Sequence, residues 1–124
     1  MQKEFLFIML MENRNSLTID VVQRHIEHLR VLDNRGKLFA CGPFIDYQGG
    51  IVILKTDSVE EAHNIAQRDP FIKEGYKSYE IRTMEWARKE NNYGINEYRR
   101  LAFFTKRYCR QISITKEPGS ERRP

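Results

Sequence analysis

Residues 24–71 read RHIEHLRVLDNRGKLFACGPFIDYQGGIVILKTDSVEEAHNIAQRDPF, and the fold follows from how this stretch divides into elements. Its first part belongs to a helix predicted over Thr18–Asp33, because apolar residues there recur at spacings of four and three and make one stripe. The stripe consists of Val22, Ile26, Leu29 and Leu32. Gly36 is suited to the left-handed position that ends such a helix.

A hairpin and a second helix fill the rest of this stretch. Residues 38–41 are an apolar run that Gly42-Pro43 is expected to stop, residues 46–50 are a turn, and residues 51–54 are the returning strand. Ser58 and Glu61 have the spacing of a capping box, which predicts that a helix begins there. Asp69-Pro70 is expected to end it, because the residue before a proline avoids the helical conformation.

Two more strands, predicted over residues 3–11 and 76–86, flank this stretch. The resulting order is strand, helix, strand, strand, helix, strand, which is the ferredoxin-like pattern of an α+β fold. It places two helices on one face of a four-stranded antiparallel sheet. Residues 5–11, however, are seven consecutive apolar residues, which predicts that both faces of that strand are buried. We therefore expect a homodimer with its sheets packed face to face, and the alternative cover is the chain's own tail.

Composition separates a domain from a basic extension. The chain has 124 residues, and residues 1–86 hold 11 Lys and Arg against 13 Asp and Glu, a net of −2. Residues 87–124 hold 10 against 4, a net of +6. We expect a domain over residues 1–86 and an extension over residues 87–124, helical over 95–110 and disordered from 117 to 124. No apolar run is long enough to span a membrane, so we expect a cytoplasmic protein whose two cysteines are reduced.

The motifs of residues 5–86, taken in order, resemble the YciI-like (YCII-related) family. They are His28-Leu29, Gly36, residues 40–43 (ACGP), residues 50–54 (GIVIL), residues 57–62 (DSVEEA), and Asp69-Pro70-Phe71 with Gly75 shortly after. The resemblance covers about two thirds of the chain and leaves out residues 87–124. It implies a dimeric α/β-barrel fold, and a relation to small enzymes that shift protons or eliminate leaving groups on ring compounds.

The resemblance also implies a His-Asp acid–base dyad, which carries over to His28 and Asp69. Members often have Arg three residues before the histidine, and this chain departs from that pattern with His25, preceded by Arg24. A histidine beside an aspartate can exchange protons near neutral pH. The alternative is that His28 only packs against the sheet and Asp69 only accepts backbone hydrogen bonds.

Around this dyad we expect a small-molecule site. Its candidate substrate-binding residues are Arg24, His25, Gly42, Pro43, Asp46 and Phe71. His25 and His28 have a spacing that could serve a metal, but no further ligand is suitably spaced, and we expect neither a metal nor a cofactor. Phosphate-loop, dinucleotide-binding and serine-hydrolase motifs are absent from the sequence.

Three functions stay open at this point. The first is an enzyme that moves a proton on a small organic substrate, as an isomerase or a lyase. The second is a non-catalytic ligand-binding or accessory domain with the same pocket. The third, ranked below both, is nucleic-acid binding through the basic and aromatic residues of the tail. Against the third, the sequence has no aromatic run of the kind that RNA-binding sheets of this type carry.

Overall fold

A computed structural model describes residues 4–102 of the chain. Residues 4–86 form one compact unit, and residues 87–102 belong to a second. The first unit has the element order that the sequence predicts, with one additional short helix. Its elements are β1 (Phe5–Asn13), α1 (Ile19–Asn34), β2 (Leu38–Pro43), β3 (Gly49–Leu54), α2 (Val59–Arg68), α3 (Pro70–Lys73) and β4 (Lys77–Glu85).

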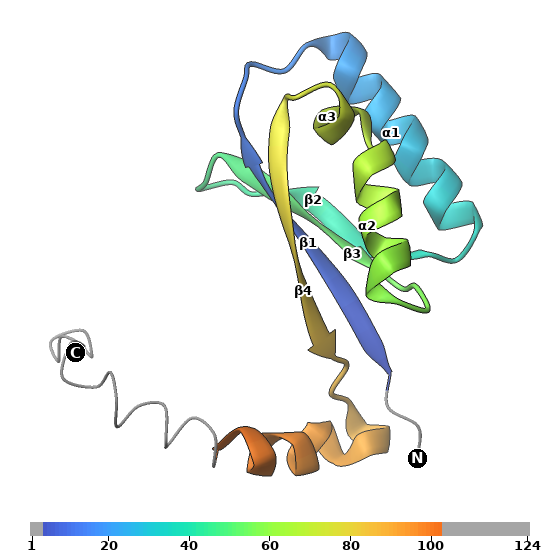
Figure 1. Cartoon of the computed structure of the whole chain (residues 1–124), viewed down its shortest axis with the longest axis vertical. Coiled ribbons are helices and arrows are strands. Elements are labelled where there is room, and N and C mark those ends of the chain that lie inside the picture. The colour runs from blue at the N-terminus through green and yellow to red at the C-terminus, as the bar shows by residue number, and fades with distance from the viewer. Residues whose placement is uncertain (1–3, 103–124) are drawn as a thin grey trace, which may run out of the picture. The chain divides into compact units, whose positions relative to one another are not determined.

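The four strands make one antiparallel sheet in the order β2-β3-β1-β4, so β1 and β3 are central and β2 and β4 are the edges. The helices lie together on one face of this sheet (Figure 1). This is the ferredoxin-like α+β fold, of the class called dimeric α/β barrel, and it confirms the predicted fold class. The α1 and α2 helices begin at Thr18 and Ser58, whose side chains accept hydrogen bonds from the amides of Val21 and Glu61.

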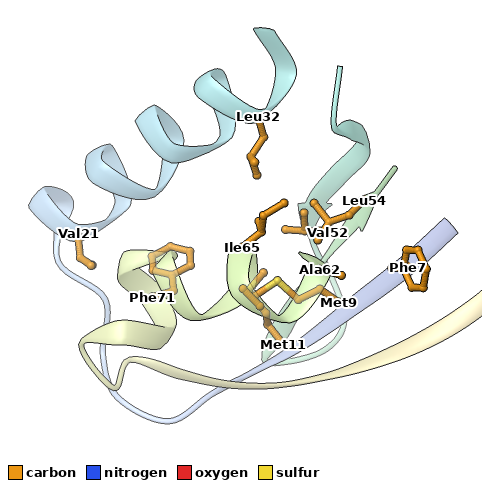
Figure 2. Close-up of a cluster of buried hydrophobic side chains, with 11 residues drawn as sticks. Phe7, Met9, Met11, Val21, Leu32, Val52, Leu54, Ala62, Ile65 and Phe71 are labelled. Carbon is orange, nitrogen blue, oxygen red and sulfur yellow. The ribbon is translucent and has the colours of Figure 1, made fainter. Parts of the chain in front are cut away.

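The core lies between the sheet and the helices (Figure 2). The strands contribute side chains from alternate positions, as the pleat of a sheet requires. On β1 these are Phe7, Met9 and Met11, and on β3 they are Val52 and Leu54. The helices contribute Val21, Leu32, Ala62, Ile65, Ala66 and Phe71.

The buried side of α1 is rotated by about one position from the predicted stripe. Val21, His25 and Leu32 are its buried residues. Val22 and Leu29 are half-buried, and Ile26 is 40% exposed. The structure therefore turns a histidine toward the core and leaves part of the apolar stripe facing an opening beside the sheet.

One predicted element end was wrong, and a second was correct but is followed at once by a further helix. The β2 strand continues through Gly42-Pro43 as far as Pro43, which it can do because an edge strand tolerates a proline. Asp69-Pro70 ends α2, as predicted, but Pro70 also begins α3. Proline suits the first position of a helix because the amide it lacks would have no partner there.

The second unit contains a 3₁₀ segment, η1 (Lys89–Gly94), followed by a helix over residues 95–102. Asn92 and Tyr93 have positive φ, which divides this segment. The predicted helix over residues 95–110 is present as far as residue 102, and its remainder and residues 117–124 lie outside the described residues. Within residues 4–102, no helix is long and apolar enough to cross a membrane.

The pairing of β3 with β1 includes a close backbone contact at Gly49. A Cβ there would lie 2.1 Å from the backbone oxygen of Met11, whereas a Cβ at Gly42 would meet nothing within 4 Å. We expect Gly49→Ala to lower the free energy of unfolding by about 1–3 kcal/mol, because the backbone of β1 must move. Gly42→Ala is the matched control and is expected to change it by about 0.5 kcal/mol or less. Urea unfolding measures both, and equal losses would contradict the contact.

Candidate functional site

Asp69 occupies the junction between α2 and α3 and is almost fully buried, with 1% of its surface exposed. Its carboxylate accepts a hydrogen bond from the Phe71 amide, 2.9 Å from Oδ1. Its backbone oxygen accepts hydrogen bonds from the amides of Ile72 and Lys73. The side chain therefore caps α3 while its second oxygen remains free for another partner. A buried carboxylate requires such a partner, because removing the charge from water is costly.

His25 is that partner. It projects from α1, and its Nδ1 lies 2.9 Å from each carboxylate oxygen of Asp69. An ionised carboxylate can only accept hydrogen bonds, so Nδ1 carries the proton in this pair. In the neutral imidazole, the lone pair then resides on Nε2. Within the described chain no other residue hydrogen-bonds to Nε2, which leaves this atom available to a bound molecule.

Phe71 fixes the plane of the His25 ring. The two rings are stacked, with centroids 4.0 Å apart and planes 17° from parallel. Phe71 is itself held by the helical turn that Asp69 caps. The carboxylate and the stacking partner thus come from the same short segment, and together they restrain both the position and the tilt of the imidazole.

A pocket of about 330 Å³ opens beside His25, and we call it the α1–hairpin pocket. Its walls are mostly apolar, and its size lies at the lower end of the range of small-molecule sites. From α1 it takes Val22, His25, Ile26 and Leu29, and from the hairpin Gly42, Pro43, Gly50 and Ile51. Met11, Leu17, Phe71 and Lys77 complete it.

Lys77, at the start of β4, is the second polar side chain of this pocket and is only 7% exposed. Its Nζ lies 4.5 Å from the ring centroid of Phe71. Burial lowers the pKa of Lys77, and the nearby carboxylate of Asp69 opposes that shift. The sequence analysis missed this residue. The alternation of β4 could have revealed it, since Lys77 lies on the same face of the strand as Tyr79 and Ile81, which pack against the core.

His28 does not occupy the position that the sequence analysis gave it. It is half-buried one turn along α1 and does not line the pocket, and within residues 4–102 it makes no hydrogen bond to Asp69. Burial lowers the pKa of His28, with smaller effects from His25 and Arg68, and Asp69 opposes the shift. The predicted pairing of His28 with Asp69 was wrong, because the rotation of α1 points His25 at the carboxylate instead.

The other predicted site residues divide into two groups. Gly42, Pro43 and Phe71 line the pocket together with His25. Arg24 and Asp46 do not line it. Arg24 is engaged by Asp20 and Glu74 on the exposed side of α1, and both hydrogen bonds raise its pKa. Asp46 is exposed in the loop between β2 and β3. Among residues 4–102, no group of three or more His, Cys, Asp or Glu residues is placed to hold a metal ion.

Two solved structures resemble this fold. The first is the 5-chloro-2-hydroxyhydroquinone dehydrochlorinase TftG from Burkholderia phenoliruptrix AC1100, in complex with 2,5-dihydroxybenzoquinone. It is 25% identical, with a TM-score of 0.55 over 70% of this chain and 99% of that one. The second is muconolactone isomerase, which is 16% identical, with a TM-score of 0.55 over 67% of this chain and 88% of that one. At that identity, the second likeness concerns the fold alone.

Sequence comparisons identify the family. Uncharacterized protein YjpA of Bacillus subtilis (strain 168) is 33% identical over 86 residues, which cover 69% of this chain and 99% of that protein. The family model of the YCII-related domain matches residues 5–86, which contain β1 to β4, the His25–Asp69 pair and the α1–hairpin pocket. The chain belongs to the YCII-related domain family.

Proposed function

We propose that this protein is an enzyme that transfers a proton on a small organic substrate, with His25 as the acid–base group and Asp69 as its positioning partner. One observation carries the proposal: His25 is bound through Nδ1 to a buried carboxylate while it lines an apolar pocket. This arrangement leaves Nε2 as the proton-exchanging atom.

The reaction follows from this geometry in two steps. The lone pair of Nε2 removes a proton from an acidic carbon or a ring hydroxyl of the substrate, and the electron pair of the broken C–H or O–H bond moves into the substrate. Asp69 stabilises the imidazolium that forms, without itself taking the proton. In an isomerisation the imidazolium returns the proton to a different carbon. In an elimination a leaving group departs with an electron pair.

The likeness to TftG supports an elimination or a related proton shift. That protein is named as a dehydrochlorinase, and the structure to which this chain is similar holds 2,5-dihydroxybenzoquinone. A small cyclic compound with acidic positions also suits the size and apolar walls of the α1–hairpin pocket. We infer that the substrate belongs to this class of ring compounds.

Two other functions compete with this one. A non-catalytic binding domain could use the same His25–Asp69 pair to hold a ligand, so turnover is the measurement that separates it from an enzyme. For nucleic acid, the uncovered face of the central strands carries Ile8, Leu10, Ile51 and Ile53, whereas RNA-binding sheets present aromatic residues there. The tail residues that prompted this alternative lie mainly outside the described residues. A cytoplasmic location stays a prediction from the sequence.

We further propose that the enzyme is a homodimer joined through the uncovered face of the sheet. In the register of β1 and β3, Ile8 lies opposite Ile53 and Leu10 lies opposite Ile51. These four aliphatic side chains are half-buried in the single chain. A contiguous apolar patch at the centre of a sheet is typical of a surface that a partner covers.

The dyad can be tested with probes of the proposed class. We expect the wild type to isomerise α-angelica lactone, a cyclic ester whose ring double bond moves by a proton shift, or to release chloride from 5-chloro-2-hydroxyhydroquinone. His25→Asn should lower kcat/KM by about 10²–10⁴-fold, since it removes the acid–base group. Asp69→Asn should also lower it, because an amide keeps the cap of α3 but loses the charge that stabilises the imidazolium. Proton NMR and chloride titration provide the measurements.

His28→Asn is the matched control, because His28 lies on the same helix but outside the pocket. We expect its kcat/KM to stay within about threefold of the wild type. A large loss in the His28 variant together with an unchanged His25 variant would reverse the assignment. Full activity in all three variants would exclude the dyad.

His28 also leads to a prediction about stability and pH. Its pKa is lower in the folded chain than in the unfolded chain, so the unfolded chain binds the proton more tightly. Stability from this group is therefore present above the unfolded pKa and is lost as pH falls through the folded one. Chemical unfolding between pH 8 and pH 5, at constant ionic strength, should show a smaller loss for His28→Asn than for the wild type. A parallel loss would show that His28 makes no such contribution.

The dimer is tested by sedimentation of the full chain at micromolar concentration. We expect the wild type to sediment as a dimer of its 14.8 kDa chain, and Ile8→Lys to shift it toward the monomer by placing a charge in the interface. Ile19→Lys is the control, because Ile19 is 77% exposed on α1, on the other side of the sheet. A monomeric wild type would favour cover by the tail.

A further inference from the structure

Lys77 lacks the partner that a buried lysine ordinarily has. It is more than nine-tenths buried, and lysines in such positions are almost always paired. Within residues 4–102, Nζ of Lys77 makes no hydrogen bond or ion pair, and it forms a cation–π contact with the ring of Phe71. It lines the α1–hairpin pocket, so a ligand in that pocket lies next to a lysine that has no partner among the described residues.

Two groups near Lys77 favour its ammonium form. The π face of Phe71, 4.5 Å away, attracts a cation, and the field of the Asp69 carboxylate also favours the protonated form. Burial acts in the other direction and is the larger effect, so the pKa of Lys77 is lowered. An ammonium that has lost its water and has no counter-ion gains from binding an anion.

We propose that Lys77 binds the carboxylate of the substrate, and that the substrate is therefore a small organic acid with a flat apolar body. This inference rests on the proposed function of the same pocket, whose acid–base group it complements. Lys77 and His25 are the polar side chains among the pocket's lining residues. The remaining walls are apolar apart from backbone groups, which suits the body of a ring compound.

The geometry lets the two groups act on one molecule. The ring of Phe71 contacts both of them, at 4.0 Å from the His25 ring and 4.5 Å from Lys77 Nζ, each measured from the same centroid. The separation between the His25 ring centroid and Lys77 Nζ is therefore at most the sum of these two distances. Both side chains also line the same pocket, so a molecule held by its carboxylate at Nζ shares that pocket with His25. Lys77 would thus determine which molecule enters, while His25 performs the proton transfer.

The test compares two probes of equal shape, benzoate and benzamide, by NMR titration of the full-length protein at neutral pH. We expect benzoate to bind about 10- to 100-fold more tightly, the usual value of a hydrogen bond to a charged group. The ¹³Cε signal of Lys77, assigned by its loss in Lys77→Met, should shift with benzoate and not with benzamide. Lys77→Met should lose the preference while keeping the affinity for benzamide, and Lys77→Arg should retain the preference.

Lys73→Met is the matched control, since Lys73 is exposed and lies outside the pocket, and it should bind as the wild type does. Equal wild-type affinities for the two probes would overturn the proposal, as would a Lys77→Met variant that still prefers benzoate. If Lys77→Met does not fold, the lysine ¹³Cε signals of the wild type decide. The spectrum of Lys73→Met shows which of these signals belongs to Lys73. The proposal is overturned if none of the other lysine signals shifts with benzoate and stays unchanged with benzamide.

The proposed function and this inference fail in different ways. Asp69→Asn should lose proton transfer and keep the preference for benzoate, because the carboxylate of Asp69 is not part of the anion contact. A wild type that prefers benzoate but transfers no proton on the ring probes or on their carboxylated analogues would overturn the enzyme and leave the binding role of Lys77. A wild type that transfers protons without preferring benzoate would overturn the role of Lys77 alone.

Discussion

The buried carboxylate of Asp69 is the constraint on which the rest of the site depends. A charge at that depth must be compensated, and the compensation comes from two directions, the Phe71 amide in α3 and the imidazole of His25 in α1. Removing one partner of such a buried pair typically lowers the free energy of unfolding by about 3–5 kcal/mol, because the other group is left as an uncompensated buried charge. The carboxylate therefore links two helices and selects the rotation of α1 at which His25 faces inward.

That rotation creates the pocket. With Val21, His25 and Leu32 turned inward, Val22, Ile26 and Leu29 form an apolar wall that faces the end of the hairpin instead of the core. If α1 served only to cover the sheet, these apolar side chains would face solvent without a structural role. As the side of a cavity, the wall leaves room for a ligand next to Nε2. The local electrostatics of Asp69 thus decide where a small molecule can bind.

Sequence patterns predicted the fold well, because strands and amphipathic helices produce strong periodic signals over many residues. The resemblance to the YCII-related family, and not periodicity, pointed to Asp69 and Phe71. Sequence patterns paired Asp69 with His28, whereas the structure pairs it with His25, because two histidines three residues apart share a helix face and only tertiary packing sets the rotation of that face. They missed Lys77 because a single charged residue at the start of a strand looks like an ordinary solvated end. The rotation and the cavity both depend on contacts between elements that are distant in the chain.

The residues of the site lie on elements that tolerate amino-acid substitution to different degrees. Asp69 and Phe71 belong to one capped turn, which supports both the start of α3 and the carboxylate of the proposed dyad. Lys77 lies on the edge strand β4 and lines the pocket without hydrogen-bonding to that carboxylate. If Lys77 selects the substrate as proposed, related proteins can exchange the residue at this position and acquire new substrates over evolutionary time while the dyad is kept.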